Sequence, residues 1–389
     1  MSGNSAAERP PHLPVDQPRL RQPPAGTTVD RVLDDLLSAI SRPSTPEDKY
    51  LLIKGISGMG SRILRALAGI LYAGLSERRL LIDWSDPVYS SDRNNVFHRF
   101  FKSVSCSATY LTPATESIYP KIWKGRLHDS ARQIANERSY NPSEVRRYLS
   151  IDISKSDYPE RVVVLTGYNA RMDLLTTRVR GRFEELTRIS DSDILRGLLR
   201  REFTLQPDIS ERIELFKRSY FDMPTVGIHV RFSDFRSPLL RTIRHLNRLL
   251  RHEPRLRIFV ATDNIAILKL FHSNYSDVVA TPHWYGVPGA TIHVNRANPD
   301  PTEAGIEALV DLHLLAQCDY LIFDPASTFA LVADLLSSAP EPNRIKVRAL
   351  PLSKGNRHRR HATNWLLRVS NFSSWAFQLL PKLVSVRKL

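Results

Sequence analysis

Residues 50–84 read YLLIKGISGMGSRILRALAGILYAGLSERRLLIDW, and this stretch indicates the fold class. The apolar run at 50–53 predicts a buried strand. A glycine-rich loop at 55–62 follows it, and the next apolar residues recur at helical spacing. The run at 79–84 predicts a second strand. A strand, a helix and a strand in this order form a βαβ unit, which favours a parallel sheet.

The rest of the chain continues this alternation. We expect strands at 162–165, 224–230, 257–261, 278–280 and 320–323, and helices at 28–41, 179–202, 208–219, 238–252, 265–272, 304–316 and 328–336. The later elements predict a second doubly wound domain over 224–350. The fold class is therefore α/β, with two Rossmann-like domains that face one cleft.

Composition divides the chain into four parts. Residues 1–27 are rich in proline and should be disordered. Residues 28–222 form an N-terminal α/β domain, residues 223–350 form a C-terminal Rossmann-like domain, and residues 351–389 form a basic amphipathic tail.

The net charge, the two cysteines and the lack of long apolar runs limit which kinds of protein this chain can be. With 55 Lys and Arg against 40 Asp and Glu, the chain carries +15 and should attract an anion such as a nucleotide diphosphate, a phospholipid surface or nucleic acid. Cys106 and Cys318 fit no zinc motif, and we interpret them as reduced core thiols. The sequence contains no apolar run long enough to span a membrane and no secretory signal at its start.

The glycine loop is the first candidate for ligand binding, because ligands bind at the carboxyl ends of parallel strands. Gly58 and Gly60 allow close backbone approach, and the helix that starts near Ser61 and Arg62 offers free amides to an anion. We interpret these four residues as a loop that faces the cleft. A plain tight turn is the simpler alternative. A phosphate-binding P-loop is disfavoured, because its lysine is missing here.

The strand at 224–230 leads into His229 and Arg231, which project from the same face because side chains alternate along a strand. An arginine at this position can bind a diphosphate through two hydrogen bonds and stabilise a departing nucleoside diphosphate. The alternatives are a structural ion pair of Arg231 with Asp234 or Asp263, and a core position for His229.

Three further polar residues follow later strands or lie among apolar residues. Asp311 is in the middle of an apolar helix, where a carboxylate needs a partner or a ligand. Ser327 and Thr328 begin the next helix, where hydroxyls and amides can bind a phosphate. A buried ion pair at Asp311 and a simple helix cap at Ser327 remain the alternatives.

These motifs, in this order, resemble the α1,6-fucosyltransferase superfamily, which includes NodZ-like bacterial nodulation enzymes and the animal N-glycan core fucosyltransferases. The resemblance is carried by Gly58-Met59-Gly60-Ser61-Arg62, Ile82-Asp83-Trp84, Val226-Gly227-Ile228-His229-Val230-Arg231, Ala261-Thr262-Asp263-Asn264, Val310-Asp311-Leu312-His313-Leu314-Leu315-Ala316-Gln317-Cys318-Asp319-Tyr320-Leu321-Ile322 and Ser327-Thr328. It implies a GT-B-like fold, with an acceptor-side domain before residue 223 and a donor domain after it.

The resemblance also implies an activity: an inverting transfer of L-fucose from GDP-β-L-fucose to a sugar hydroxyl, without a metal ion or other cofactor. Arg231 would clamp the diphosphate, and His229 and Asp311 would line the GDP pocket. Asp263 would lie near the donor, and Ser327 would meet the phosphates.

The general base is not carried over, because the sequence departs from the family after Arg231: Phe232, Phe235 and Leu239 stand at positions where many members have charged residues. The candidate bases are Asp83, Asp86, Asp234 and Glu303. A transferase for another nucleotide sugar, and a non-catalytic glycan- or membrane-binding protein on the same fold, are the alternative functions.

The tail at 351–389 has eight Lys and Arg, no acidic residue, and several aromatic residues. This composition suits an anionic membrane surface. We therefore expect a cytoplasmic protein, attached peripherally to the inner face of the plasma membrane, that acts on an oligosaccharide or a lipid-linked glycan. A tail that packs back on the N-terminal domain is the alternative, and no nucleic-acid-binding module is visible.

Overall fold

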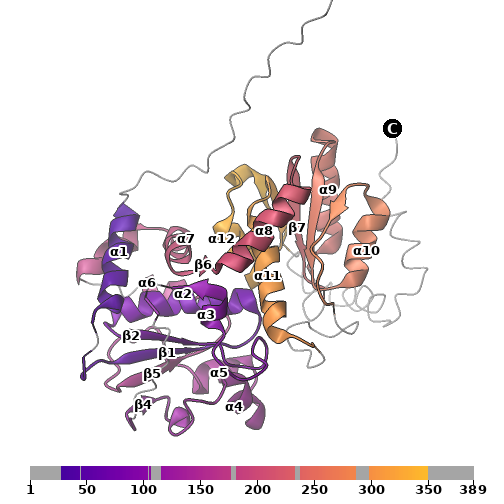
Figure 1. The fold of residues 1–389 in the computed structure, drawn as a ribbon. Helices are drawn as coiled ribbons and strands as arrows, with labels where there is room; N and C mark the ends of the chain where they lie inside the picture. The colour runs from indigo at the N-terminus through magenta and orange to yellow at the C-terminus, as the bar shows by residue number, and fades with distance from the viewer. Residues whose placement is uncertain are drawn as a thin grey trace, which may run out of the picture.

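The structure is a computed structural model that describes residues 28–43, 45–103, 105–106, 115–176, 181–232, 237–285 and 298–348. The N-terminal segment 1–27, the tail 351–389 and the candidate residues Asp234 and Phe235 lie outside these ranges. Among the described residues, the strands form two parallel sheets and one short antiparallel pair (Figure 1).

The first sheet confirms the predicted βαβ unit. Strands β1 (Tyr50–Lys54) and β2 (Arg79–Asp83) pair in parallel and are connected through α2 (Met59–Leu75). The strand order is β2-β1-β5-β4, with β5 (Val162–Leu165) and β4 (Ile118–Tyr119) completing the sheet. Because β1 and β5 are flanked on both sides, they are apolar throughout or nearly so.

The remaining elements of this half surround the sheet. They are α1 (Thr28–Ser41), α3 (Phe97–Phe100), β3 (Phe101–Lys102), η1 (Lys121–Trp123), α4 (Ala131–Glu137), α5 (Pro142–Tyr148), α6 (Met172–Thr176), η2 (Gly181–Arg188), α7 (Asp191–Glu202) and β6 (Thr204–Leu205). The single helix predicted at 179–202 is therefore two elements over its described part. The break has a local cause, because the Ser190 hydroxyl accepts a hydrogen bond from the Asp193 amide and caps a new helix.

The second sheet also has the predicted parallel, doubly wound form. Its strand order is β11-β10-β7-β8-β9, formed by β7 (Thr225–Val230), β8 (Arg257–Thr262), β9 (Val278–Val279), β10 (Tyr320–Phe323) and β11 (Arg344–Lys346). The chain proceeds from β7 to β8 on one side and later returns to β10 on the other. This reversal opens a crevice at the carboxyl ends of β7 and β10, which is the usual ligand position in such sheets.

The second half contains five helices within the described residues, and the last two contact α2 of the first domain. They are α8 (Pro207–Tyr220), α9 (Leu239–His252), α10 (Ile265–Asn274), α11 (Pro301–Ala316) and α12 (Thr328–Leu336), and η4 (Glu341–Asn343) precedes β11. Helix α8 precedes the boundary predicted at 222/223, but it packs with the second sheet: the ring of Phe216 lies 5.7 Å from that of Phe259.

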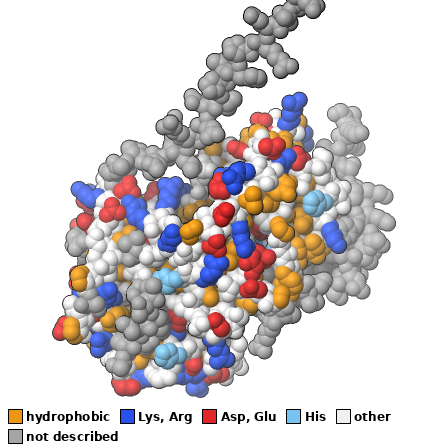
Figure 2. Space-filling model, viewed as in Figure 1, with side chains coloured by type: hydrophobic (Ala, Val, Ile, Leu, Met, Phe, Trp, Pro, Cys, Tyr) orange, Lys and Arg blue, Asp and Glu red, His pale blue; other side chains and the backbone are white. Residues whose placement is uncertain are grey.

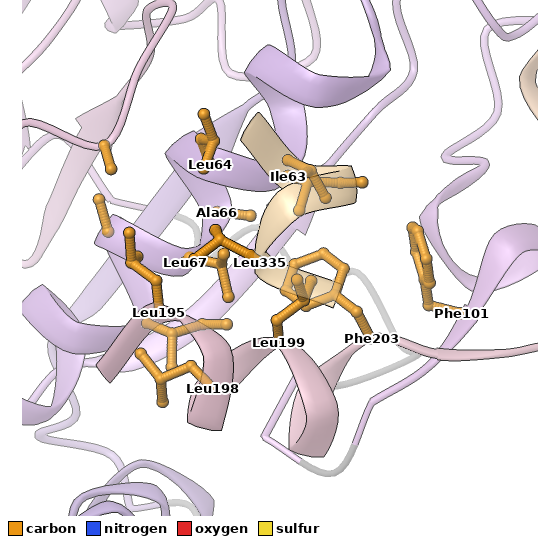
Figure 3. Packing of buried hydrophobic residues seen from close by; sticks show 14 of the residues in the cluster. Ile63, Leu64, Ala66, Leu67, Phe101, Leu195, Leu198, Leu199, Phe203 and Leu335 are labelled. Carbon is orange, nitrogen blue, oxygen red and sulfur yellow. The ribbon is translucent and has the colours of Figure 1, made fainter. Parts of the chain in front are cut away.

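Helix α12 packs across the domain boundary on α2 and α7. Leu335 of α12 lies beside Ile63 and Leu67 of α2 and beside Leu199 of α7 (Figure 3). Helix α2 is consequently buried on nearly every side, which explains why apolar and small residues occur all around it; its Arg62 and Arg65 are buried as well. The shared core fixes the first residues of α12 against those of α2.

Both cysteines are buried, as expected for core thiols. Within the described ranges, no helix is long and apolar enough to cross a membrane.

Candidate active site

A cavity lies where the carboxyl ends of the second sheet face the first domain. From the second domain it is lined by His229, Arg231, Ala261, Thr262, Asp263, His283, Trp284, Asn298, Ala304, Glu307, Ala308, Asp311, Thr328 and Phe329, and from the first by Gly58, Met59, Gly60, Val88 and Tyr89. The sequence-predicted residues His229, Arg231, Asp263, Asp311 and Thr328 are thus brought together, although up to 99 positions separate them in the chain.

His229 ends β7 inside this cavity and is only 7% exposed. Its ring stacks on that of Phe329, with 5.1 Å between the centroids. Burial, and then the positive charge of Arg231, lower the pKa of His229 to about 3. The imidazole is therefore neutral at physiological pH. Its Nδ1 has no hydrogen-bond partner among the described residues, so it can bind a polar group of a ligand.

Asp263 connects the ends of the two central strands. Its Oδ1 accepts a hydrogen bond of 2.6 Å from the backbone N–H of Phe232, two residues beyond β7. The contact fixes the backbone immediately after Arg231, whose own N–H donates to the Ser237 hydroxyl at 3.2 Å. Arg231 consequently leaves the sheet from a well-defined position at the cavity wall.

Asp311 is buried, as predicted from its apolar helix, but its partner is a hydroxyl: the Thr281 Oγ1 donates a hydrogen bond to its carboxylate. Burial raises the pKa of Asp311, while nearby His283 and the hydrogen bond from Thr281 act in the opposite direction. His283 lies 3.2 Å, Nε2 to O, from the Thr262 carbonyl, and its Nδ1 has no partner among the described residues. A hydrogen-bond acceptor, Asp311, and an imidazole with an unpaired ring nitrogen, His283, thus both line this end of the cavity.

The start of α12 forms the opposite wall. Thr328 lines the cavity, and its hydroxyl lies 3.0 Å from that of Ser61 in α2. Ser327 is at the N-cap position, yet its side chain makes no capping hydrogen bond, and its buried Oγ has no partner within the described ranges. The first amides of α12 are therefore not satisfied by this side chain, and an anion at the cavity wall can accept hydrogen bonds from them.

The glycine loop lines the cavity with its backbone and places no charged side chain there. Gly58 and Gly60 line the cavity, whereas Arg62, which the sequence placed at the cleft, is 1% exposed and is not one of the lining residues. Its guanidinium pairs with Asp86 and lies 4.9 Å from the ring centroid of Tyr89. The ion pair with Asp86 is needed because an unpaired buried charge would be costly. Through Tyr89, which lines the cavity, Arg62 supports the cavity wall without reaching the cavity itself.

Three of the four candidate bases are held in ion pairs. Asp83 pairs with the buried Lys54, and Asp86 pairs with Arg62. Glu303 pairs with Arg212 of α8. The fourth, Asp234, lies outside the described residues. The carboxylates that line the cavity are instead Asp263, Glu307 and Asp311.

Glu307 was missed by the sequence analysis, although a signal was present. It precedes Asp311 by four residues in a helix, so both side chains must lie on one face. Burial raises the pKa of Glu307 above its ordinary value. Tyr89, His283 and Trp284 were missed as well, and nothing in their local sequence distinguishes them from other loop residues.

The fold and the cavity define a GT-B-type protein, with two Rossmann-like domains and a ligand site between them. Comparison with known proteins agrees with this class. Residues 186–340 match the family model described as Nodulation protein Z (NodZ). The chain is 29% identical over 310 residues to Nodulation protein Z of Bradyrhizobium diazoefficiens, covering 75% of this chain and 80% of that protein. The predicted resemblance to NodZ-like fucosyltransferases is confirmed.

A second relative and a solved structure are also NodZ proteins. Nodulation protein Z of Azorhizobium caulinodans is 23% identical over 322 residues, covering 75% of this chain and 90% of that protein. The crystal structure of NodZ alpha-1,6-fucosyltransferase soaked with GDP-fucose superposes with a TM-score of 0.50 at 19% identity, covering 75% of this chain and 93% of that one. This last similarity supports the fold.

Proposed function

We propose that this chain is a glycosyltransferase that moves L-fucose from GDP-fucose to a carbohydrate hydroxyl. The observation that carries the proposal is the position of Arg231: it lines one cavity with the start of α12 and the Gly58–Gly60 backbone. The similarity to Nodulation protein Z, and to a NodZ structure soaked with GDP-fucose, supports the same donor.

The diphosphate would bind between Arg231 and the first amides of α12. A guanidinium presents two parallel N–H groups to phosphate oxygens, and a helix N-terminus adds a partial positive charge. Gly58 and Gly60 let the backbone of the first domain approach the same place.

The nucleoside would bind at the Asp311 end. Guanine presents a ring N–H and an amino group side by side, both of which are donors, and a carboxylate is a matching double acceptor. Adenine presents one donor beside one acceptor and fits less well. The buried Asp311 therefore favours GDP over ADP.

In the reaction, the acceptor hydroxyl attacks C1 of fucose from the face opposite the diphosphate. The bond between C1 and the diphosphate oxygen breaks, and GDP leaves with the electron pair. Arg231 and the α12 amides offset the charge that develops on GDP. Because these groups supply positive charge, we propose that no metal ion is required.

The acceptor proton needs a base, and we assign it to Glu307. It is half-buried, lines the cavity, and has a pKa raised by burial, which makes its carboxylate a stronger base than an exposed one. Glu307→Gln should lower kcat by about 10²-fold or more and leave the Kd for GDP nearly unchanged. Fucosyl-transfer assays measure kcat, and calorimetry measures the Kd for GDP.

The matched control is Glu303→Gln, one turn earlier in α11, where the carboxylate pairs with Arg212 instead. It should change kcat by no more than a few-fold, because exposed ion pairs contribute little. Equal losses in both variants would remove Glu307 from the role of base.

The function itself is tested with radiolabelled GDP-fucose, a mixture of oligosaccharides and an excess of EDTA over trace metal. We expect GDP release and labelled oligosaccharide at the same rate with and without EDTA. Absence of both products, or a preference for UDP- or ADP-sugars, would contradict the proposal.

We also propose that the chain attaches to an anionic membrane surface on the cytoplasmic side. The tail at 351–389 lies outside the described residues, but α9 supports the idea. Its arginines 241, 244, 248 and 251 recur every three or four residues, and the helix has no acidic residue. On the face drawn in Figure 2, acidic and basic side chains are mixed.

The α9 arginine stripe lies near the root of the tail, because Arg241 donates to the Arg348 carbonyl at 2.7 Å. The stripe and the tail would thus reach one surface together. Each cation near an anionic membrane contributes about 1 kcal/mol. Full-length protein should therefore pellet with anionic vesicles at low salt, and both deletion of 351–389 and Arg244→Glu/Arg248→Glu should reduce the pelleted fraction. Equal pelleting of all three proteins would refute membrane attachment.

A further inference from the structure

Arg65 of α2 is a buried cation that forms no ion pair with the described residues. The residue is 4% exposed, and its Nε has no hydrogen-bond partner in the part of the chain that the structure describes. A buried charge without a partner is costly, so such charges are normally paired. Arg62, three residues earlier, follows this rule through its pair with Asp86. Arg65 does not, and it does not line the candidate active site.

The charged groups around Arg65 add positive charge instead of offsetting it. Burial, and then the charges of Arg146 and Arg171, lower the pKa of Arg65 to about 10. No acidic residue is among these causes. The guanidinium is still protonated at physiological pH, so a buried cation lies near two further cations.

The rest of the chain offers few acidic side chains that could balance this charge. Outside the described ranges the sequence contains three acidic residues, Glu8, Asp16 and Asp234. The stretch 177–180, directly after α6, reads TRVR and has none. A counter-ion that comes from outside the chain is therefore favoured.

The loop after β5 makes room for the Arg65 guanidinium. Gly167 has a φ of +133°, and a Cβ at this position would lie 2.7 Å from the Arg65 Nη2. Arg171, at the end of this loop, has a φ of +50°, which residues other than glycine rarely adopt. Strain of this kind persists only where the surrounding structure imposes it, and it is common at ligand sites. The loop also lies at the carboxyl end of a parallel strand, where ligands bind in such sheets.

The other two guanidinium groups are accessible from solvent. Arg146 is exposed in the last turn of α5. Arg171 is partly exposed and donates from Nε and Nη2 to the Asp173 carboxylate, at 3.0 Å each. That pair does not use Nη1, which can still donate to a ligand. The three arginines come from α2, α5 and the segment just before α6, and α6 lies against α2 (Figure 1).

We propose that Arg65, Arg146 and Arg171 form a binding site for a phosphate-type oxyanion, either inorganic phosphate or the phosphate group of a monoester. Phosphate has several acceptor oxygens and about two negative charges at neutral pH, whereas a carboxylate has one charge. Guanidinium groups match the geometry of phosphate oxygens. The bound ion neutralises Arg65 and stabilises α2 against the first sheet. The site is separate from the proposed donor site and does not depend on fucosyl transfer.

The test uses the full-length chain with Arg231→Ala throughout, because phosphate would also bind at the proposed donor site. Four proteins are compared: this background alone, and the background with Arg65→Met, Arg146→Ala or Arg147→Ala. Arg147→Ala is the matched control. It removes the same charge from the next position of α5, where the guanidinium lies 5.2 Å from the ring centroid of Tyr148.

Inorganic phosphate is titrated against chloride of equal ionic strength, and thermal unfolding and the ³¹P line width are measured. In the background and in Arg147→Ala we expect a saturable rise in Tm of about 2–4 °C. Arg65→Met should abolish this rise, and Arg146→Ala should weaken phosphate binding about tenfold. In chloride alone, Arg65→Met should be at least as stable as the background, because an apolar side chain replaces an unpaired buried charge.

A second titration with methyl phosphate identifies the source of the phosphate group. Tighter binding of methyl phosphate would assign the site to a monoester, and tighter binding of inorganic phosphate would assign it to the free ion. Phosphate binding that is equal in all four proteins, or absent from the background, would overturn the site. So would a clear loss of stability of Arg65→Met in chloride. Because Arg146 is exposed, its variant should fold and decides the question even where Arg65→Met does not fold.

Discussion

Arg231→Ala is expected to lower kcat for fucosyl transfer by about 10³-fold, because an arginine that offsets charge on a departing phosphate typically accounts for 10³–10⁵. The variant should also bind GDP more weakly. Arg231→Lys should recover only part of the loss, since an ammonium cannot offer two parallel N–H groups to a diphosphate. Single-turnover assays with GDP-fucose measure the step directly.

The control for this experiment is Arg244→Ala in α9, which removes the same charge at an exposed position that does not line the cavity. It should leave turnover within a factor of two of wild type, a difference of about 0.4 kcal/mol. The circular dichroism spectrum of Arg231→Ala should match that of wild type, because Arg231 lies at the cavity wall rather than in the core. Near-normal turnover in folded Arg231→Ala would remove Arg231 from its assigned role.

Gly60→Ala is expected to damage the site through packing rather than charge. A Cβ at this position would lie 2.5 Å from the Cα of Phe329, which is closer than real contacts allow. The atoms it would meet belong to the backbone of Thr328 and Phe329, which cannot rotate away as a side chain can. The starts of α2 and α12 would have to separate, at a cost of about 1–3 kcal/mol.

The separation should carry the α12 amides away from Arg231, so Gly60→Ala should lose GDP binding as well as stability. Urea unfolding and calorimetry measure the two effects. Ser61→Ala is the matched control: it removes the hydroxyl contact to Thr328 at 3.0 Å without adding volume and should cost only about 1 kcal/mol. Wild-type affinity for GDP in Gly60→Ala would show that contact between α2 and α12 is not needed for the site.

Most of the fold could be predicted because apolar runs and helical spacing are local signals. Strands β1, β7 and β10 are buried and bounded by polar residues, so their ends are visible in the sequence, and with them the positions of His229, Arg231 and Thr328. The parallel arrangement then placed these ends at one edge of a sheet.

The failures concern partners that are distant in sequence. Arg62 was predicted to face the cleft and Asp83 was a candidate base, but the fold pairs Arg62 with Asp86 and Asp83 with Lys54. Glu307 could have been found, since its spacing from Asp311 is a local signal, but its position at a cavity depends on the first domain.

The most direct measurement is calorimetric titration of the full-length protein with GDP, ADP and UDP, in buffer with EDTA, repeated with Arg231→Ala. We predict that GDP binds at least about tenfold more tightly than ADP or UDP, because only guanine presents two adjacent donors to the buried Asp311 carboxylate, and that Arg231→Ala weakens GDP binding strongly. Equal binding of the three nucleotides, or GDP binding that is indifferent to Arg231, would contradict it.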